Sequence, residues 1–212
     1  HDALPIWAWR LRRLLQGAQA RLVDQLSAPQ EGGADAERLD ADPPQLVDRV
    51  ERHQAMLDVN VLGMVLGCHC AFEPLRRTPG ARVINMASAT AIYGQPELAI
   101  YSSTKFFVRG LTEALDIEWE RYGIRVIDMW PLFVRTAMTD DMHIGTSDSL
   151  GINLSAQDVA EAIVAAVDTS GMRKTLHQVH FPVGGPARVM SVASRFLPGP
   201  VNRLINKRLS QQ

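Results

Sequence analysis

The sequence predicts an α/β fold in which helices cover a mostly parallel sheet. Two observations lead to this prediction. Helical and strand-like patterns alternate from Pro43 onward, which is typical of βαβ units. The composition, with 46% hydrophobic and 21% charged residues, is that of a globular protein. A length of 212 residues allows one sizeable domain, so we expect residues 1–212 to form a single domain.

The first predicted helix runs to Arg76-Arg77 and is followed at once by a strand. Apolar residues recur at helical spacing along this helix: Leu46, Val50, Met56, Leu57, Val61, Leu62, Val65, Leu66 and Ala71. Pro79-Gly80 ends the helical pattern. Residues 81–88 are β-branched at their centre and end in small residues, which predicts a strand that leads into a site.

A second helix and strand follow in the same order. The helical pattern returns from about Ile100 to Arg121, and Tyr122-Gly123 supplies its C-terminal stop. Residues 124–130 then form a second buried strand. Residues 134–154 have no clear period, and we expect a mobile loop there that covers a pocket and shapes the substrate site.

The last third of the chain predicts one more helix and strand. Ser155 and Asp158 begin a helix whose apolar face continues to Val167, and residues 177–183 form the third strand. Residues 187–209, interrupted by two prolines, predict a broken helix on the outside or at a subunit interface. A membrane-surface anchor is the alternative for this stretch.

Charge and composition exclude several classes of protein. The net charge of -1 comes from 22 basic and 23 acidic residues, so we expect no nucleic-acid partner. The uncharged stretch 59–72 is shorter than the roughly 20 residues of a membrane span, so no span is expected. Two cysteines and no secretory leader pattern favour the cytoplasm. Cys68-His69-Cys70 point in different directions on a helix, so we expect no metal site.

Three residues form the candidate catalytic site. Tyr101 and Lys105 stand four residues apart on the predicted helix, so their side chains share one face. A phenol with a pKa of about 10 is a poor base near neutrality, and a nearby ammonium would lower that pKa. Ser88 ends the preceding strand, where open α/β sheets place their ligands, and its hydroxyl could stabilise charge on a substrate oxygen.

Two segments together resemble the short-chain dehydrogenase/reductase family. These segments are residues 83–88 (Val-Ile-Asn-Met-Ala-Ser) and residues 101–105 (Tyr-Ser-Ser-Thr-Lys). In that family the serine stands thirteen residues before the tyrosine, as Ser88 and Tyr101 do here. The resemblance implies a Rossmann-like, doubly wound parallel sheet in three α/β/α layers.

The resemblance also implies a fourth catalytic residue, Asn60, and a set of cofactor contacts. Asn60 lies in a segment similar to the family's N-V-x-G motif, whose asparagine holds a water that connects the lysine to solvent; the alternative is a buried asparagine bonded to the backbone. Pro131, Val134 and Thr136 lie in a segment similar to the P-G-x-V-x-T turn that meets the nicotinamide carboxamide. Leu132 replaces the glycine of that turn, which would disfavour a positive φ there.

By resemblance, the chain is an NAD(P)-dependent oxidoreductase acting on a small or medium alcohol or ketone. Hydride would pass from the nicotinamide C4, Tyr101 would donate the proton, Ser88 would polarise the carbonyl, and Lys105 would bind the nicotinamide ribose. The same resemblance implies a homodimer or homotetramer built through the long helices. The sequence does not decide between NAD and NADP.

The resemblance fails before about residue 50. The family's glycine-rich pyrophosphate turn has no counterpart there, since Gly32-Gly33 precedes no clear βα turn. We therefore expect residues 1–50 to be an atypical lead, residues 51–212 to be the catalytic part, and the first strands of the sheet to be missing. Two alternatives remain: a non-catalytic remnant that cannot bind cofactor, and a nucleotide-sugar epimerase, which shares the Y-x-x-x-K pair.

Overall fold

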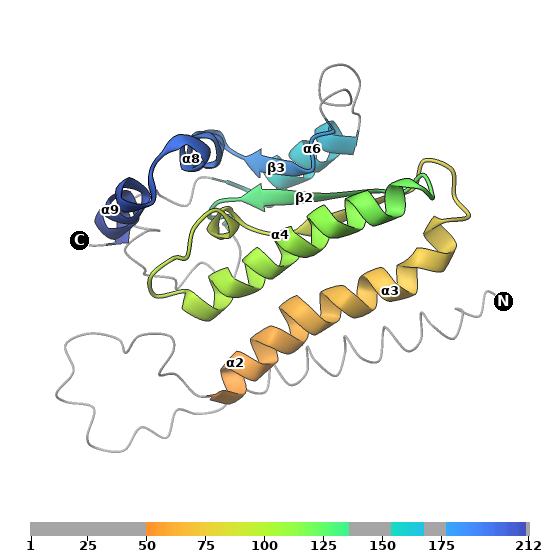
Figure 1. Ribbon diagram of the computed structural model, residues 1–212, viewed down its shortest axis with the longest axis horizontal. Coiled ribbons are helices and arrows are strands. Elements are labelled where there is room, and N and C mark those ends of the chain that lie inside the picture. Colours follow the sequence, from red (N-terminus) through yellow and green to blue (C-terminus); the bar gives the residue numbers. More distant parts are fainter. Residues whose placement is uncertain (1–49, 136–153, 168–176, 211–212) are drawn as a thin grey trace. The chain divides into compact units, whose positions relative to one another are not determined.

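The computed structural model describes residues 50–135, 154–167 and 177–210 (Figure 1). The chain divides into two compact units, residues 1–74 and 75–212, and each is described by itself. Thr136, the lead at 1–49 and most of the expected loop at 134–154 lie outside the described residues. The expectation of a single domain therefore stays a prediction.

The first unit contributes one helical run with a π-helical turn in its middle. The run consists of α2 (Val50–Leu57), η3 (Asp58–Leu62) and α3 (Gly63–Leu75). The π-turn is closed by the Gly63 backbone N–H, which donates to the carbonyl of Asp58. The predicted helix is confirmed, whereas the periodicity gave no sign of the π-turn inside it.

This helical run is also apolar. By length and composition alone, Val50–Leu75 could cross a membrane, because an 18-residue window within it has a mean hydropathy of 1.6. It is the one such helix among the described residues. The buried core helix of a water-soluble protein can be equally long and apolar, so length and composition alone do not assign a membrane span to Val50–Leu75. The expected absence of a membrane span stays a prediction.

The second unit is built on a parallel sheet with the strand order β1-β2-β3. The strands are β1 (Arg82–Met86), β2 (Arg125–Pro131) and β3 (His180–Val183). Both pairings are parallel, with Ile84 opposite Ile127 and Met129 opposite Phe181. The central strand β2 is buried along nearly its whole length, as expected of a strand covered on both faces.

Helices cover the two faces of this sheet (Figure 1). Because successive side chains of a strand point to opposite faces, alternate residues of β2 contact each layer of helices. Ile127 and Met129 join the core cluster that α6 (Ala156–Val167) completes through Val159 and Ala166. On the other face lies α4 (Ala99–Glu120), whose Thr112 accepts a hydrogen bond from Asn85 of β1 at 2.9 Å. The predicted three-layer arrangement is confirmed.

Backbone turns and caps set the ends of these helices. The residue that ends the turn after α4 is Gly123, which has a φ of 71° and so adopts the left-handed conformation that glycine favours. At the start of α6, the Ser155 side chain accepts from the Asp158 N–H at 3.2 Å, and Asp158 accepts in return from the Ser155 N–H at 2.7 Å. This is a reciprocal cap, and it lies where the sequence predicted that the helix begins.

The last two helices are α8 (Gly185–Phe196) and α9 (Gly199–Ser210). They confirm the predicted broken helix, because the chain turns at Leu197, whose backbone is extended, just before Pro198. The Asn206 side chain of α9 donates to the carbonyl of Gly94 at 2.7 Å, which ties α9 to the loop before α4.

Candidate active site

Ser88 lies just beyond the carboxyl end of β1 and is nearly fully buried. The neighbouring Ala87 N–H continues the sheet by donating to the Met129 carbonyl at 3.1 Å. The Ser88 hydroxyl accepts from the Thr90 N–H at 3.2 Å and thereby caps the short 3-10 turn η4 (Ala89–Ala91). It also donates to the carbonyl of Pro131 at 3.5 Å, so it lies where β1 and β2 end.

Tyr101 and Lys105 lie in the first two turns of α4 and meet Ser88 there. The Ser88 side chain lies close enough to the Tyr101 phenol to influence its pKa. The Lys105 Nζ lies 5.3 Å from the centre of the Tyr101 ring and donates to the Met86 carbonyl at 3.1 Å. The structure therefore brings these three predicted residues together at the carboxyl edge of the sheet.

Burial dominates the electrostatics of this group. It raises the pKa of Tyr101, and the side chain of Ser88 opposes that rise. Burial also lowers the pKa of Lys105. The expected lowering of the Tyr101 pKa by the ammonium is not the dominant effect, because Lys105 is bound to the Met86 carbonyl and lies over the ring. A protonated Tyr101 near neutrality suits a proton donor.

The segment after β2 carries the residues expected at the cofactor. Pro131 is the last residue of β2 and is buried. Val134 forms an isolated parallel bridge with Leu154, supported by the Arg135 N–H, which donates to the Leu154 carbonyl at 2.8 Å. Leu132 is not among the described residues with a positive φ, so its side chain causes no strain there. Thr136 lies outside the described residues.

Asn60 belongs to the first unit, where it lies inside the π-helical turn η3. Such turns occur frequently at functional sites. Its expected role as the residue that holds a water beside Lys105 stays a prediction.

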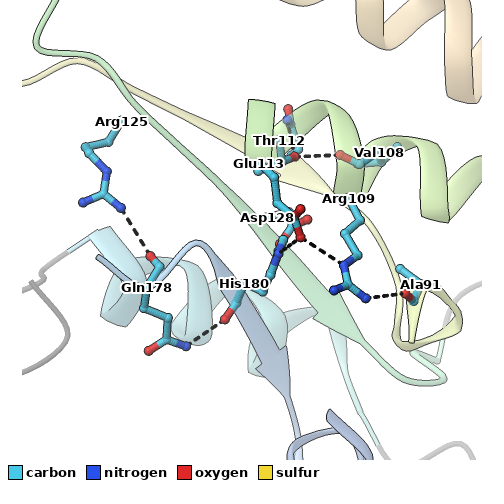
Figure 2. A network of polar contacts seen from close by, with 10 residues as sticks. Ala91, Val108, Arg109, Thr112, Glu113, Arg125, Asp128, Gln178 and His180 are labelled. Carbon is cyan, nitrogen blue, oxygen red and sulfur yellow. Dashed lines mark hydrogen bonds and ion pairs between the residues drawn. The ribbon is translucent and has the colours of Figure 1, made fainter. Parts of the chain in front are cut away.

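The sequence did not predict a polar cluster on the α4 face of the sheet. It consists of Arg109 and Glu113 of α4, Asp128 of β2 and His180 of β3 (Figure 2), and we call it the His180 cluster. One signal was available, since Asp128 lies between apolar residues of the buried strand β2 and His180 begins the otherwise apolar strand β3.

Fold and site together define an α/β protein with a serine, a tyrosine and a lysine gathered where parallel strands end. A family model described as short chain dehydrogenase matches residues 40–145, half of the chain. The chain belongs to the short-chain dehydrogenase family.

Comparisons with individual proteins agree with this assignment. A diacetyl reductase [(S)-acetoin forming] of Staphylococcus aureus is 33% identical over 102 residues, which cover 48% of this chain and 40% of that protein. A 3-ketoacyl-(acyl-carrier-protein) reductase from Brucella melitensis, solved with NADH, is 26% identical with a TM-score of 0.57, covering 66% of this chain and 60% of that one.

A third similarity concerns the fold alone. A short chain dehydrogenase from Burkholderia cenocepacia, solved in complex with NADP, has a TM-score of 0.63 at 19% identity, covering 77% of this chain and 63% of that one. The predicted Rossmann-like fold is confirmed by these neighbours. The chain spans less than half the length of the curated relative and under two thirds of the solved structures.

Proposed function

We propose that this protein is an NAD(P)-dependent oxidoreductase that interconverts a carbonyl compound and an alcohol. The observation that carries the proposal is the gathering of Ser88, Tyr101 and Lys105 at the carboxyl edge of the sheet, with the Lys105 ammonium 5.3 Å from the centre of the Tyr101 ring. In this arrangement Tyr101 transfers the proton to or from the substrate oxygen. Ser88 donates a hydrogen bond to the same oxygen and stabilises the charge that develops on it.

The residues at the carboxyl edge of the sheet fit the nicotinamide half of the cofactor. An ammonium has three donors, and Met86 is the acceptor that the described residues provide for Lys105, so two donors are available for ribose hydroxyls. The Val134 backbone and Thr136 would hold the carboxamide beside Pro131. When bound, the nicotinamide supplies or accepts the hydride at C4. The solved relatives contain NADP or NADH, so both dinucleotides are candidates.

The names of the relatives support a small or medium carbonyl substrate. The curated relative is described as a reductase of diacetyl, and the solved one as a reductase of 3-ketoacyl groups. Both names describe a ketone reduced to an alcohol. We therefore propose a ketone and its secondary alcohol as the substrate pair. A homo-oligomeric state and a cytoplasmic location stay predictions.

The test compares Tyr101→Phe with Tyr122→Phe in NAD(P)H-dependent reduction of diacetyl and a small panel of ketones. Tyr122 follows α4 and is more than one third exposed, so it serves as the matched control. A proton donor typically contributes about 10²–10⁴-fold, so Y101F should lose that much of kcat while Y122F keeps wild-type activity. Equal activity of the two variants would overturn the assignment of Tyr101.

A non-catalytic remnant is the second candidate, because no glycine-rich strand–helix turn for a pyrophosphate occurs among the described residues. Titration of the purified protein with NADH and NADPH separates the two candidates. Submillimolar binding of either dinucleotide excludes the remnant, whereas binding of neither supports it.

A further inference from the structure

The His180 cluster joins α4, β2 and β3 through side-chain contacts (Figure 2). His180 is held from both sides of its ring. Its Nδ1 lies 2.7 Å from Oδ1 of Asp128, and its Nε2 lies 2.7 Å from Oε1 of Glu113. The ring also stacks on Trp130, with the ring centres 4.6 Å apart.

The number of protons in the cluster follows from these contacts. A carboxylate only accepts hydrogen bonds, so each of the two short contacts of His180 needs a proton on the ring nitrogen. A neutral imidazole has one N–H and could satisfy only one contact. The geometry therefore favours a doubly protonated His180, whose charge, together with that of Arg109, balances the two carboxylates.

The carboxylates of Glu113 and Asp128 differ in burial. This difference decides which of the two could take the second proton of the His180 ring. The Glu113 side chain is 48% exposed; burial alone would raise its pKa, but hydrogen bonds from His180 and Arg109 lower the pKa overall. The Asp128 side chain is fully buried, and that burial raises its pKa against the opposing hydrogen bond from His180. The alternative to a doubly protonated His180 is thus a protonated Asp128 beside a neutral ring.

Arg109 connects the cluster to the candidate active site. Its Nε donates to Glu113 at 3.2 Å, and its Nη1 donates to the Ala91 carbonyl at 3.3 Å. Ala91 ends the turn that Ser88 caps. On α4, Arg109 is one helical turn beyond Lys105 and two beyond Tyr101. The guanidinium also lies 5.1 Å from the centre of the Trp130 ring, next to Pro131.

We propose that the His180 cluster is a positioning unit, in which a doubly protonated His180 holds the helix of Tyr101 and Lys105 in register with the Ser88 turn. Arg109 links the cluster to this turn, because its guanidinium donates both to Glu113 of the cluster and to the Ala91 carbonyl of the turn. The inference rests on the proposed function in one respect, namely that Tyr101 transfers a proton. The contacts of the His180 cluster do not depend on that function.

Other titratable groups lie near His180. His177, Arg188 and Arg195 line the same surface pocket as His180 and Glu113, and none of them has a carboxylate partner among the described residues. Arg125 is paired with Asp116 at 2.9 Å, and its Nη2 donates to the Gln178 carbonyl. The two carboxylates of the cluster are therefore the anions in contact with the His180 ring.

The first test measures the protonation of His180 directly. In ¹⁵N-labelled protein at pH 7, we expect both ring nitrogens of His180 to resonate as protonated nitrogens, with the signals assigned by comparison with H180Q. If the proton resides on Asp128 instead, the His180 ring is neutral, and one of its two nitrogens would resonate as an unprotonated nitrogen. That result would overturn the proposal.

The second test asks whether the cluster positions Tyr101. The chain has three tyrosines, so [¹³Cζ]tyrosine labelling gives three signals, and Y101F assigns the one from Tyr101. We expect Glu113→Gln and Asp128→Asn to shift the Tyr101 signal, and Glu118→Gln, an exposed site on the same helix, to leave it in place.

A purely structural cluster would lower the melting temperature of both variants without moving that signal. An unmoved signal in folded E113Q therefore contradicts the proposal. E113Q keeps the test decisive if D128N does not fold, because Glu113 is half exposed. The two NMR measurements need neither cofactor nor turnover. They can therefore support or contradict the positioning role even if the protein is not an oxidoreductase.

Discussion

At the residue scale, one substitution removes both of the roles that we assign to Ser88. Its hydroxyl lowers the Tyr101 pKa, and in the proposed function it donates to the substrate oxygen. Ser88→Ala should therefore raise the Tyr101 pKa further above its ordinary value, and should cost about 10²-fold in kcat, as loss of a single oxyanion donor does.

The sign of the pH effect follows from the role of the phenol. In alcohol oxidation Tyr101 acts as the base and must be ionised, so S88A should move the rising limb of the oxidation profile to higher pH. In ketone reduction the protonated form is active, so reduction should persist to higher pH. A profile of kcat/KM against pH in both directions checks this. If the limbs of both pH profiles are unchanged in S88A, then Ser88 does not affect the pKa of Tyr101.

Lys105 is the second residue whose role can be tested alone. Its ammonium donates to the Met86 carbonyl, and we propose that its remaining donors bind the ribose. A hydrogen bond from a charged group contributes about 1.5–3 kcal/mol, so Lys105→Met should weaken NAD(P)H binding by roughly tenfold or more. Fluorescence titration measures the binding, and Lys207→Met on α9 provides the matched control. Equal dissociation constants for K105M and K207M would exclude the ribose contact.

At the element scale, α4 is fixed to β2 by a buried carboxylate. Asp116 accepts from the Val126 N–H at 2.9 Å and from Arg125 Nε at 2.9 Å. Asp116→Ala leaves the buried Val126 N–H without its acceptor, which should cost about 1–3 kcal/mol of unfolding free energy. Urea denaturation measures this loss. Asp116→Asn keeps an acceptor for Val126 and should lose less; a D116A midpoint equal to wild type would contradict the argument.

The sequence predicted the elements well because each one contains its own periodic signal. The turn that ends at Gly123 after α4, the cap at Ser155 and the break before Pro198 were all set by local backbone chemistry. The π-turn that contains Asn60 was missed, because residues 59–66 are apolar at most positions, so a one-residue shift of the apolar face leaves no break in the pattern.

The candidate active site could likewise be predicted only where its residues are specified by local sequence. Ser88, Tyr101 and Lys105 could be predicted because strand end and helix spacing are local properties. The His180 cluster could not, because it depends on the parallel register that sets Asp128 opposite His180, residues 52 positions apart. That register is decided by packing across the sheet rather than by neighbouring residues.

At the scale of the whole molecule, the sheet has an edge that the described residues leave open. Within the described residues, β1 pairs with β2 alone, and Met86 at its end is 41% exposed. An open edge beside exposed apolar side chains favours association with further strands or chains. The expected homo-oligomer built through the long helices is one way to cover such surface, and it can be tested on α4.

The outer face of α4 carries an apolar stripe. Phe106, Gly110, Ala114 and Ile117 are exposed and recur at helical spacing, and the Ile117 side chain is 75% exposed. If the oligomer forms through this helix, Ile117→Lys should place a charge in the interface and shift the protein toward monomer. Analytical ultracentrifugation over a range of concentrations measures this. Val189→Lys makes the same change at a 68% exposed site on α8 and should leave the assembly intact. Dissociation by V189K but not by I117K would assign the interface to α8 instead, because a buried unpaired ammonium destabilises the contact in which it lies.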